Sequence, residues 1–385
     1  FPYTTLFRSR IAGDFVKSEG TSKKKLKKAL KTSTAVVLLT TAVLSVIYRL
    51  PLCFDSQNPA ALAAAAFTLT NGEYKLENSK TEKPTASDQK PTESADTEPV
   101  AEKNHKRDKS TYYDSYGNHD DENKYTVEER TIGDTGTQVD NCFVKNKTGL
   151  SLDFDGLLSA KLPFSIDKGI NSPQVLIYHT HTSEAYLDED VNFFYDSFYS
   201  RTNNNDFNVV AVGDALTEQL NKRGIKTVHD TTIHDESYNG SYDRSVDTVY
   251  KNLEKYPDIK VVIDLHRDAI GTDENKVKPV FTYNGKKGAQ IMILAGCDTD
   301  GERGFDCWEE NLNFALKIQD KAETLYPDMT RPLNFDYFAY NEYVCNGSLL
   351  IEVGTESNSI DEATYSGSLL GNAIADVLLD RKSTR

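Results

Sequence analysis

The stretch that decides the fold is residues 175–186, which reads V-L-I-Y-H-T-H-T-S-E-A-Y. It begins with a short apolar run, which is typical of a buried strand. The run is followed by His179, His181 and Glu184, and imidazole and carboxylate groups are the usual protein ligands of zinc. In an open α/β sheet, ligands bind beyond the carboxyl ends of the strands. The stretch therefore predicts a sheet with a candidate site at its edge.

Downstream of this stretch, apolar runs alternate with amphipathic segments. We expect strands at residues 174–178, 225–229, 259–265 and 348–353, helices at 209–223, 242–256, 308–326 and 361–379, and a hairpin of residues 277–283 and 290–295. Strands that alternate with helices favour an α/β fold with a mostly parallel central sheet and helices on both faces.

The two ends of the chain and its first apolar run predict a different organisation. Residues 1–9 and 380–385 resemble translated sequencing-adapter DNA, so they are set aside. Residues 10–31 are a basic segment that we expect to stay in the cytoplasm, and residues 32–50 are apolar enough to form a single transmembrane anchor. A cleaved signal peptide is the alternative. Both interpretations place the remainder of the chain outside the cytoplasm, and the first attaches it to the cell membrane.

Composition separates a predicted tether from a predicted folded domain. Residues 71–129 are rich in Lys, Glu, Asp, Ser and Thr, and a disordered linker is predicted at residues 51–130. The catalytic domain is expected at residues 131–379. The formal net charge of -15 argues against nucleic acid as a partner, because phosphate binding requires clustered Lys and Arg. The five cysteines form no C-x-x-C pair, so no disulfide framework is expected, although a bridge between Cys297 and Cys307 stays open.

Two further strand ends carry polar side chains. Residues 261–268 read V-V-I-D-L-H-R-D and place His266 and Arg267 at the end of an apolar strand. Residues 349–354 read L-L-I-E-V-G and place Glu352 inside a hydrophobic strand. A carboxylate there is unfavourable unless it is paired, hydrogen-bonded or bound to metal. One such residue alone is more often structural than catalytic, but three strand ends of the same kind favour a site.

These side chains have the composition of a zinc hydrolase. Catalytic zinc has about three protein ligands and an open position for water, and a nearby base takes the proton from that water. One of His179 or His181, together with Glu184 and His266, supplies the ligands of a Zn²⁺ ion. Glu352 supplies the base.

The four motifs V-L-I-Y-H-T-H-T-S-E-A-Y, S-Y-D-R-S (residues 241–245), V-V-I-D-L-H-R-D-A and L-L-I-E-V-G-T-E-S-N together resemble the stage II sporulation protein P family. Members are membrane-anchored cell-wall hydrolases of endospore-forming bacteria, and the resemblance covers about residues 140–379. The strand-end motifs also resemble zinc-dependent N-acetylmuramoyl-L-alanine amidases. This resemblance implies zinc as cofactor, with His266 as a ligand and Glu352 as the base.

The resemblance also implies a substrate and partners. The substrate would be peptidoglycan, cleaved at the amide bond between N-acetylmuramic acid and L-alanine, with endopeptidase action on peptide cross-links as a second activity. The partners would be stage II sporulation proteins D and M. Two other functions stay open, namely a zinc endo- or carboxypeptidase of wall peptides and a non-catalytic wall-binding module that tethers the membrane.

Several residue assignments stay open as well. Alignment with the amidases places the first ligand at His181, whereas the short spacing to Glu184 also permits His179. In an extended segment the two histidines point the same way. Arg267 either binds a substrate carboxylate or phosphate or pairs with Asp268.

Other polar and aromatic groups have two interpretations each. His229 and His234 either line the cleft or form local hydrogen bonds, and we favour the second. The aromatic residues at 193–199 and 337–343 either stack on sugars or pack against the domain.

Overall fold

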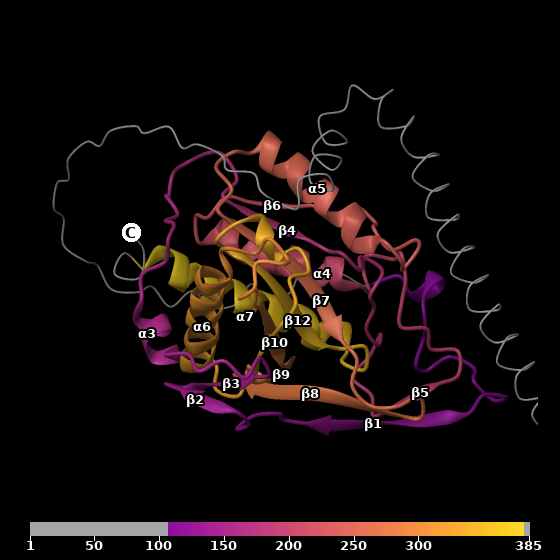
Figure 1. The fold of residues 1–385 in the computed structure, drawn as a ribbon. Helices are drawn as coiled ribbons and strands as arrows, with labels where there is room; N and C mark the ends of the chain where they lie inside the picture. The colour runs from indigo at the N-terminus through magenta and orange to yellow at the C-terminus, as the bar shows by residue number, and fades with distance from the viewer. Residues whose placement is uncertain (1–106, 381–385) are drawn as a thin grey trace, which may run out of the picture. The chain divides into compact units, whose positions relative to one another are not determined.

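The larger of two β-sheets forms the centre of the domain in this computed structural model, which describes residues 107–380 (Figure 1). Its strand order is β2-β3-β11-β10-β12-β7-β4-β6. The strands are β2 (Thr137–Val139), β3 (Cys142–Asn146), β4 (Val175–Tyr178), β6 (Thr227–His229), β7 (Val261–Asp268), β10 (Ile291–Gly296), β11 (Leu333–Asp336) and β12 (Ser348–Thr355). β7 and β12, which carry His266 and Glu352, are neighbours in its middle.

This sheet is mixed, so the prediction of a mostly parallel sheet is wrong. β6, β4, β7 and β12 run parallel to one another, but β10 is antiparallel to β12, and β2 is antiparallel to β3. Parallel neighbours require a crossover that returns the chain to the starting edge, usually a helix. The chain passes from β7 to β10 through a hairpin, without a helix. β10 therefore enters the sheet in the opposite direction.

A second sheet, which was not predicted, has the order β5-β1-β8-β9. Its strands are β1 (Lys124–Arg130), β5 (Phe193–Tyr195), β8 (Asn275–Tyr283) and β9 (Lys286–Ala289). β8 and β9 form the expected hairpin, but its second strand is Lys286–Ala289, and the residues assigned to that strand form β10 of the larger sheet. The turn residues Asn284 and Gly285 have φ values of 50° and 74°. Two successive positive φ values suit the tight two-residue hairpin turn.

The predicted disordered linker, residues 51–130, ends earlier than expected. A 3₁₀ turn, η1 (Lys109–Thr111), and the strand β1 both lie within it. β1 is ordered by neighbours on both sides, β5 and β8, which composition does not reveal because only Val127 of this strand is buried. Residues 51–106 of the predicted linker, the predicted anchor and basic segment, and residues 1–9 and 381–385 lie outside the described residues. Within residues 107–380, no helix is long and apolar enough to cross a membrane.

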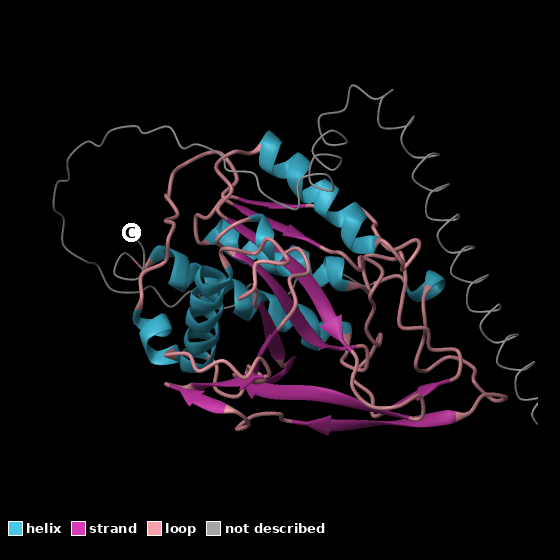
Figure 2. Cartoon of the chain, viewed as in Figure 1, coloured by secondary structure: helices cyan, strands magenta, loops and turns pink. Residues whose placement is uncertain are grey.

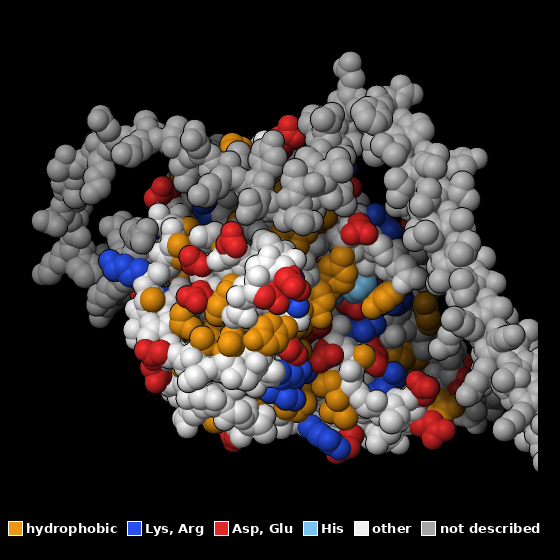
Figure 3. Space-filling model, in the orientation of Figure 1, with side chains coloured by type: hydrophobic (Ala, Val, Ile, Leu, Met, Phe, Trp, Pro, Cys, Tyr) orange, Lys and Arg blue, Asp and Glu red, His pale blue; other side chains and the backbone are white. Residues whose placement is uncertain are grey.

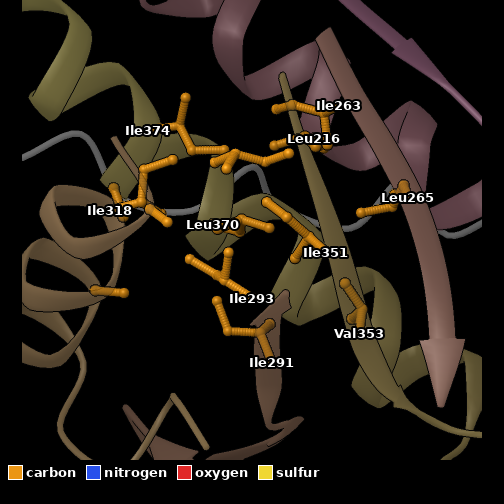
Figure 4. Close-up of a cluster of buried hydrophobic side chains, with 14 of the residues drawn as sticks. Leu216, Ile263, Leu265, Ile291, Ile293, Ile318, Ile351, Val353, Leu370 and Ile374 are labelled. Atoms are coloured by element: carbon orange, nitrogen blue, oxygen red, sulfur yellow. The ribbon is translucent and has the colours of Figure 1, made fainter. Parts of the chain in front are cut away.

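Helices cover both faces of the larger sheet, as predicted (Figure 2). They are α3 (Phe154–Ser159), α4 (Val209–Lys222), α5 (Ser241–Lys255), α6 (Trp308–Leu325) and α7 (Ile360–Leu379), with a second 3₁₀ turn, η2 (Glu342–Val344). Alternate residues of β4 point to opposite faces: Ile177 joins the core beneath α4, α6 and α7, and Leu176 packs with Val249 of α5. Figure 4 shows part of the first core, where Ile263 and Ile351 lie among helix side chains. This packing fixes the strand ends that carry the predicted site.

Candidate active site

Three predicted site residues come together at the carboxyl ends of β4 and β7. Nδ1 of His266 lies 3.4 Å from Oε2 of Glu184. The rings of His181 and His266 are nearly perpendicular, with centroids 5.3 Å apart. Nδ1 of His181 is buried and has no hydrogen-bond partner within the described part of the chain. Two imidazoles and one carboxylate thus converge from segments that are distant in sequence.

The predicted base lies directly beside this group. Glu352 on β12 is the cross-strand neighbour of His266 on β7. Its Oε2 is buried and has no hydrogen-bond partner among residues 107–380. Burial raises the pKa of Glu352 to about 8, an effect that the charges of His266 and Arg331 oppose in part. A buried carboxylate with a free oxygen is suited to accepting a proton.

Charge differs sharply between the two carboxyl groups of this site. Burial acts to raise the pKa of Glu184, but Arg267 and His266 overcome it and hold the pKa at about 2. Burial also acts to lower the pKa of His266, but Asp264 and Glu184 raise it well above its ordinary value. Burial lowers the pKa of His181. Glu184 is therefore ionised and suited to binding a cation, whereas Glu352 is the more basic carboxylate.

His179 points away from this group. Its Nδ1 donates a hydrogen bond to the carbonyl oxygen of Leu265 at 2.8 Å, and its Nε2 lies 2.8 Å from Nε2 of His229. The expectation that both histidines point the same way is wrong because the chain does not continue as a strand. It turns after β4, and the amide of Glu184 donates to the carbonyl of His181 at 3.1 Å.

The neighbours of His179 hold it in place through hydrogen bonds. His229 also contacts Asp214 through Nδ1 at 2.9 Å. A side chain at Gly213 would come within 2.5 Å of His229, so this helix position keeps space for the imidazole pair. His234 donates from Nδ1 to the carbonyl of His179 at 2.7 Å. His229 and His234 thus make local hydrogen bonds, as favoured from the sequence.

Arg267 forms its hydrogen bonds with other groups of the protein. Its Nη2 donates to the carbonyl of Ser200 at 2.7 Å, and its backbone amide donates to Oε2 of Glu184 at 3.2 Å. The side chain is buried, so the geometry gives no support to the predicted contact with substrate. The alternative pair with Asp268 is not formed either, because Asp268 pairs with Arg331 at 2.7 Å. Arg267 instead orients Glu184.

Sequence reasoning missed Tyr238 and Tyr242, which form an aromatic wall beside His181 together with Tyr340, one of the aromatic residues singled out at 337–343. Tyr238 stacks on His181 with ring centroids 4.6 Å apart and stays 63% exposed. Tyr242 meets His181 edge-on and stacks on Tyr340 at 5.2 Å. Figure 3 shows a histidine at the surface of this face beside a band of hydrophobic side chains. The motif S-Y-D-R-S was the available signal, since its Arg244 donates to the carbonyls of His234, Ser237 and Asn239 and so holds the loop that carries Tyr238.

The other aromatic segment packs against the domain through residues 193–195 and Phe198, whereas Tyr199 is 69% exposed. Phe193, Phe194 and Tyr195 form β5, and Phe194 is buried in a cluster with Val127 and Leu187. The packing interpretation therefore describes this segment.

Other candidate metal ligands do not form a free second site in the described residues. The cysteines there, Cys142, Cys297, Cys307 and Cys345, are all free thiols, so the bridge left open between Cys297 and Cys307 is not formed. Glu129, Asp190 and Glu362 place carboxylate oxygens within 4.8 Å of one another. Lys278 and Lys287 contact all three of these acids. The two ammonium groups already supply the positive charge that a metal would bring.

The group of His181, Glu184 and His266 has the ligand types of a catalytic zinc site. Two histidines and one glutamate are a known ligand set of zinc hydrolases. Nδ1 of His181 is a buried donor atom without a partner in the described chain, and Nδ1 of His266 faces the carboxylate of Glu184. That these residues bind zinc stays a prediction.

Residues 57–375 match the family of stage II sporulation protein P. The chain belongs to this family. The resemblance inferred from its four motifs is thereby confirmed. Stage II sporulation protein P of Bacillus subtilis (strain 168) is 28% identical over 222 residues, which are 53% of this chain and 49% of that relative. The match therefore spans about half the length of the relative.

Two solved structures were found to be similar to part of this stage II sporulation protein P family member. The CwlD amidase from Clostridioides difficile, in complex with the GerS lipoprotein, has a TM-score of 0.30 and 15% identity and covers 52% of this chain and 94% of its own. An N-acetylmuramoyl-L-alanine amidase from Clostridium difficile 630 has a TM-score of 0.32 and 15% identity and covers 55% of this chain and 99% of its own. At TM-scores of this size, neither likeness carries an argument about activity.

Proposed function

We propose that this chain is a zinc-dependent peptidoglycan hydrolase that acts during sporulation and cleaves the amide bond between N-acetylmuramic acid and L-alanine. The observation that carries the proposal is the convergence of His181, Glu184 and His266 beside the buried base Glu352. Membership in the stage II sporulation protein P family supports the cell-wall substrate and the role in sporulation.

Each residue has a defined part in this mechanism. When bound, zinc supplies a Lewis acid for the scissile carbonyl and lowers the pKa of its water towards about 7. His181, Glu184 and His266 would hold the ion. Glu352 takes the proton from the attacking water and passes it to the leaving amine. Burial makes Glu352 a stronger base than a solvated glutamate, which suits the first of these transfers.

The cellular setting is part of the same proposal. Residues 32–50 would anchor the chain in the cell membrane and place the catalytic domain outside the cytoplasm. The domain would then meet peptidoglycan directly, with stage II sporulation proteins D and M as partners. The net charge of -15 fits a substrate other than nucleic acid.

The test uses the purified full chain, its zinc content and digestion of peptidoglycan. We expect bound zinc, and products with free N-acetylmuramyl lactyl ends in mass spectra. Glu352→Gln should keep zinc and lose hydrolysis by about 10²–10⁴-fold, the usual contribution of a general base. Glu342→Gln is the matched control, since Glu342 is a buried acid whose pKa burial raises well above its ordinary value, so it is neutral and loses no charge.

The outcomes separate the alternative functions. Absence of zinc from the wild type would favour the non-catalytic wall-binding module. Peptide cleavage without free lactyl ends would favour the endo- or carboxypeptidase. Full activity in Glu352→Gln would remove Glu352 as the base.

A further inference from the structure

The carboxylate of Asp264 joins the two chain segments that carry the converging histidines. It accepts hydrogen bonds from the amide of Thr180 at 2.8 Å and from the Thr180 hydroxyl at 2.6 Å. Nε2 of His266 lies 2.9 Å from its Oδ1. That approach is oblique, because the N–H direction does not meet the geometry of a full hydrogen bond. One buried carboxylate thus contacts the residue next to His181 and the ring of His266.

Strand register explains this arrangement. Asp264 and His266 are two residues apart on β7, so their side chains share one face of the sheet. Tyr178, the last residue of β4, pairs with Asp264. The chain that leaves β4 therefore lies beside Asp264, and Thr180, two residues after the end of β4, forms hydrogen bonds with it. His179 lies on one side of this contact and His181 on the other.

The Asp264 side chain is buried, with 5% of it exposed. The Thr180 hydroxyl also lies 2.7 Å from the hydroxyl of Ser245, which accepts from the amide of Asn341 at 2.9 Å. The contact is thus anchored to α5 and to the loop before β12. Because the Asp264 carboxylate is fixed in this way, it can fix the positions of Thr180 and His266.

The contact with Nε2 also selects the nitrogen that His266 offers. Nε2 is taken up by this contact, so Nδ1 is the nitrogen left to serve as a ligand atom. Nδ1 is the nitrogen that faces Glu184. Asp264 lies on the opposite edge of the ring and therefore away from the converging donor atoms.

We propose that Asp264 is a positioning residue for both imidazoles of the site. It orients the His266 ring with Nδ1 towards Glu184, and it fixes the turn at Thr180 that directs His181 inwards and His179 away. Carboxylate partners of ligating histidines typically change metal affinity by about 10–100-fold when they are replaced. This inference rests on the proposed function, because it assumes that the group binds zinc.

The test measures zinc binding by the purified full chain rather than hydrolysis. Zinc affinity is measured by competition with a chromophoric chelator, and ligand geometry by the visible spectrum after Co²⁺ substitution. Asp264→Asn should weaken zinc affinity by about 10–100-fold and change the Co²⁺ spectrum. Thr180→Val removes one of the two hydrogen bonds from Thr180 to Asp264, together with the contact to Ser245, and should shift both readouts in the same direction by a smaller amount. Glu342→Gln, a buried acid without an imidazole contact, should leave both unchanged.

Each result decides the inference. Zinc affinity of Asp264→Asn within about twofold of wild type, well below the usual range, with an unchanged Co²⁺ spectrum, would overturn it and leave the proposed function intact. A wild type that binds no zinc would remove both. If Asp264→Asn fails to fold, as judged by the fluorescence of the single Trp308, the Thr180→Val variant decides: weaker zinc binding supports the inference, and unchanged binding overturns it.

Discussion

Replacement of Lys278 by Met is expected to destabilise the domain by about 3–5 kcal/mol, the usual effect of removing one partner from a buried ion pair. The Lys278 side chain is 0% exposed. Its ammonium group lies 3.0 Å from Glu129 and 3.5 Å from Glu362, and it also contacts Asp190. These acids belong to β1, α7 and the segment before β5, so Lys278 joins three parts of the fold.

Lys287→Met is the matched control for this prediction. Lys287 contacts the same acids, at 2.6 Å for Glu129 and 2.7 Å for Asp190, but its side chain is 35% exposed. Exposed ion pairs contribute about 0–1 kcal/mol, so this variant should lose far less. The difference arises at Glu362, whose side chain is only 4% exposed and which Lys278 approaches more closely than Lys287 does. A second replacement, Glu362→Gln, should therefore recover part of the loss in Lys278→Met.

Urea unfolding of the full chain measures these free energies, with the fluorescence of Trp308 as the probe. This residue is the only tryptophan of the chain and is buried in α6. Equal losses in the two Lys variants, or a loss below about 1 kcal/mol in Lys278→Met, would refute the reasoning, because burial would then not set the strength of the network.

Three further predictions follow from the described geometry. A chain that begins at Thr131 should unfold at lower urea than one that begins at Arg107, because it lacks β1; equal midpoints would show that β1 is dispensable. Burial lowers the pKa of His179 from 6.5 to about 3, so between these pH values the unfolded chain binds a proton at this residue and the folded chain does not. The free energy of unfolding should therefore fall by about 2 kcal/mol from pH 7 to pH 5. In urea titrations, His179→Gln should reduce this dependence on pH. Removal of zinc by a chelator should lower the unfolding free energy by about 2.7 kcal/mol when free zinc was 100 times its Kd; His181→Ala should abolish this effect and His179→Gln should keep it, and the reverse pattern would make His179 the ligand.

The sequence predicts best the strands that are buried on both faces. Such strands are almost continuously apolar, and residues 259–265 and 348–353 were accordingly recognised as the cores of β7 and β12. β1 was not predicted because its sequence, K-Y-T-V-E-E-R, has only one buried side chain. This strand depends on pairing with β8, whose residues lie far along the chain. The direction of β10 likewise depends on the route of the connection before it, which apolar periodicity does not encode.

The candidate site divides in the same way. His266, Glu184 and Glu352 could be singled out because charged or ionisable groups at buried strand ends require a reason. The sequence could not show that His181 points into the site and His179 away from it, because this difference arises from a turn that is held by tertiary contacts. Asp264 was visible as the polar residue of an apolar strand, but its partner Thr180 lies 84 residues earlier. The role of Asp264 depends on strand register, so the local sequence pattern around it does not reveal this role.

β12 is the last strand in sequence among residues 107–380, yet it lies between β7 and β10 near the middle of the larger sheet. A chain made from its N-terminus must therefore complete β7 and β10 while the place between them is still vacant. Their unpaired edges are open to wrong pairing until residues 348–355 arrive. Glu352 enters with that strand, so the proposed base is the last of the site residues to be added. A chain that still lacks β12 would thus have a divided sheet and an incomplete site.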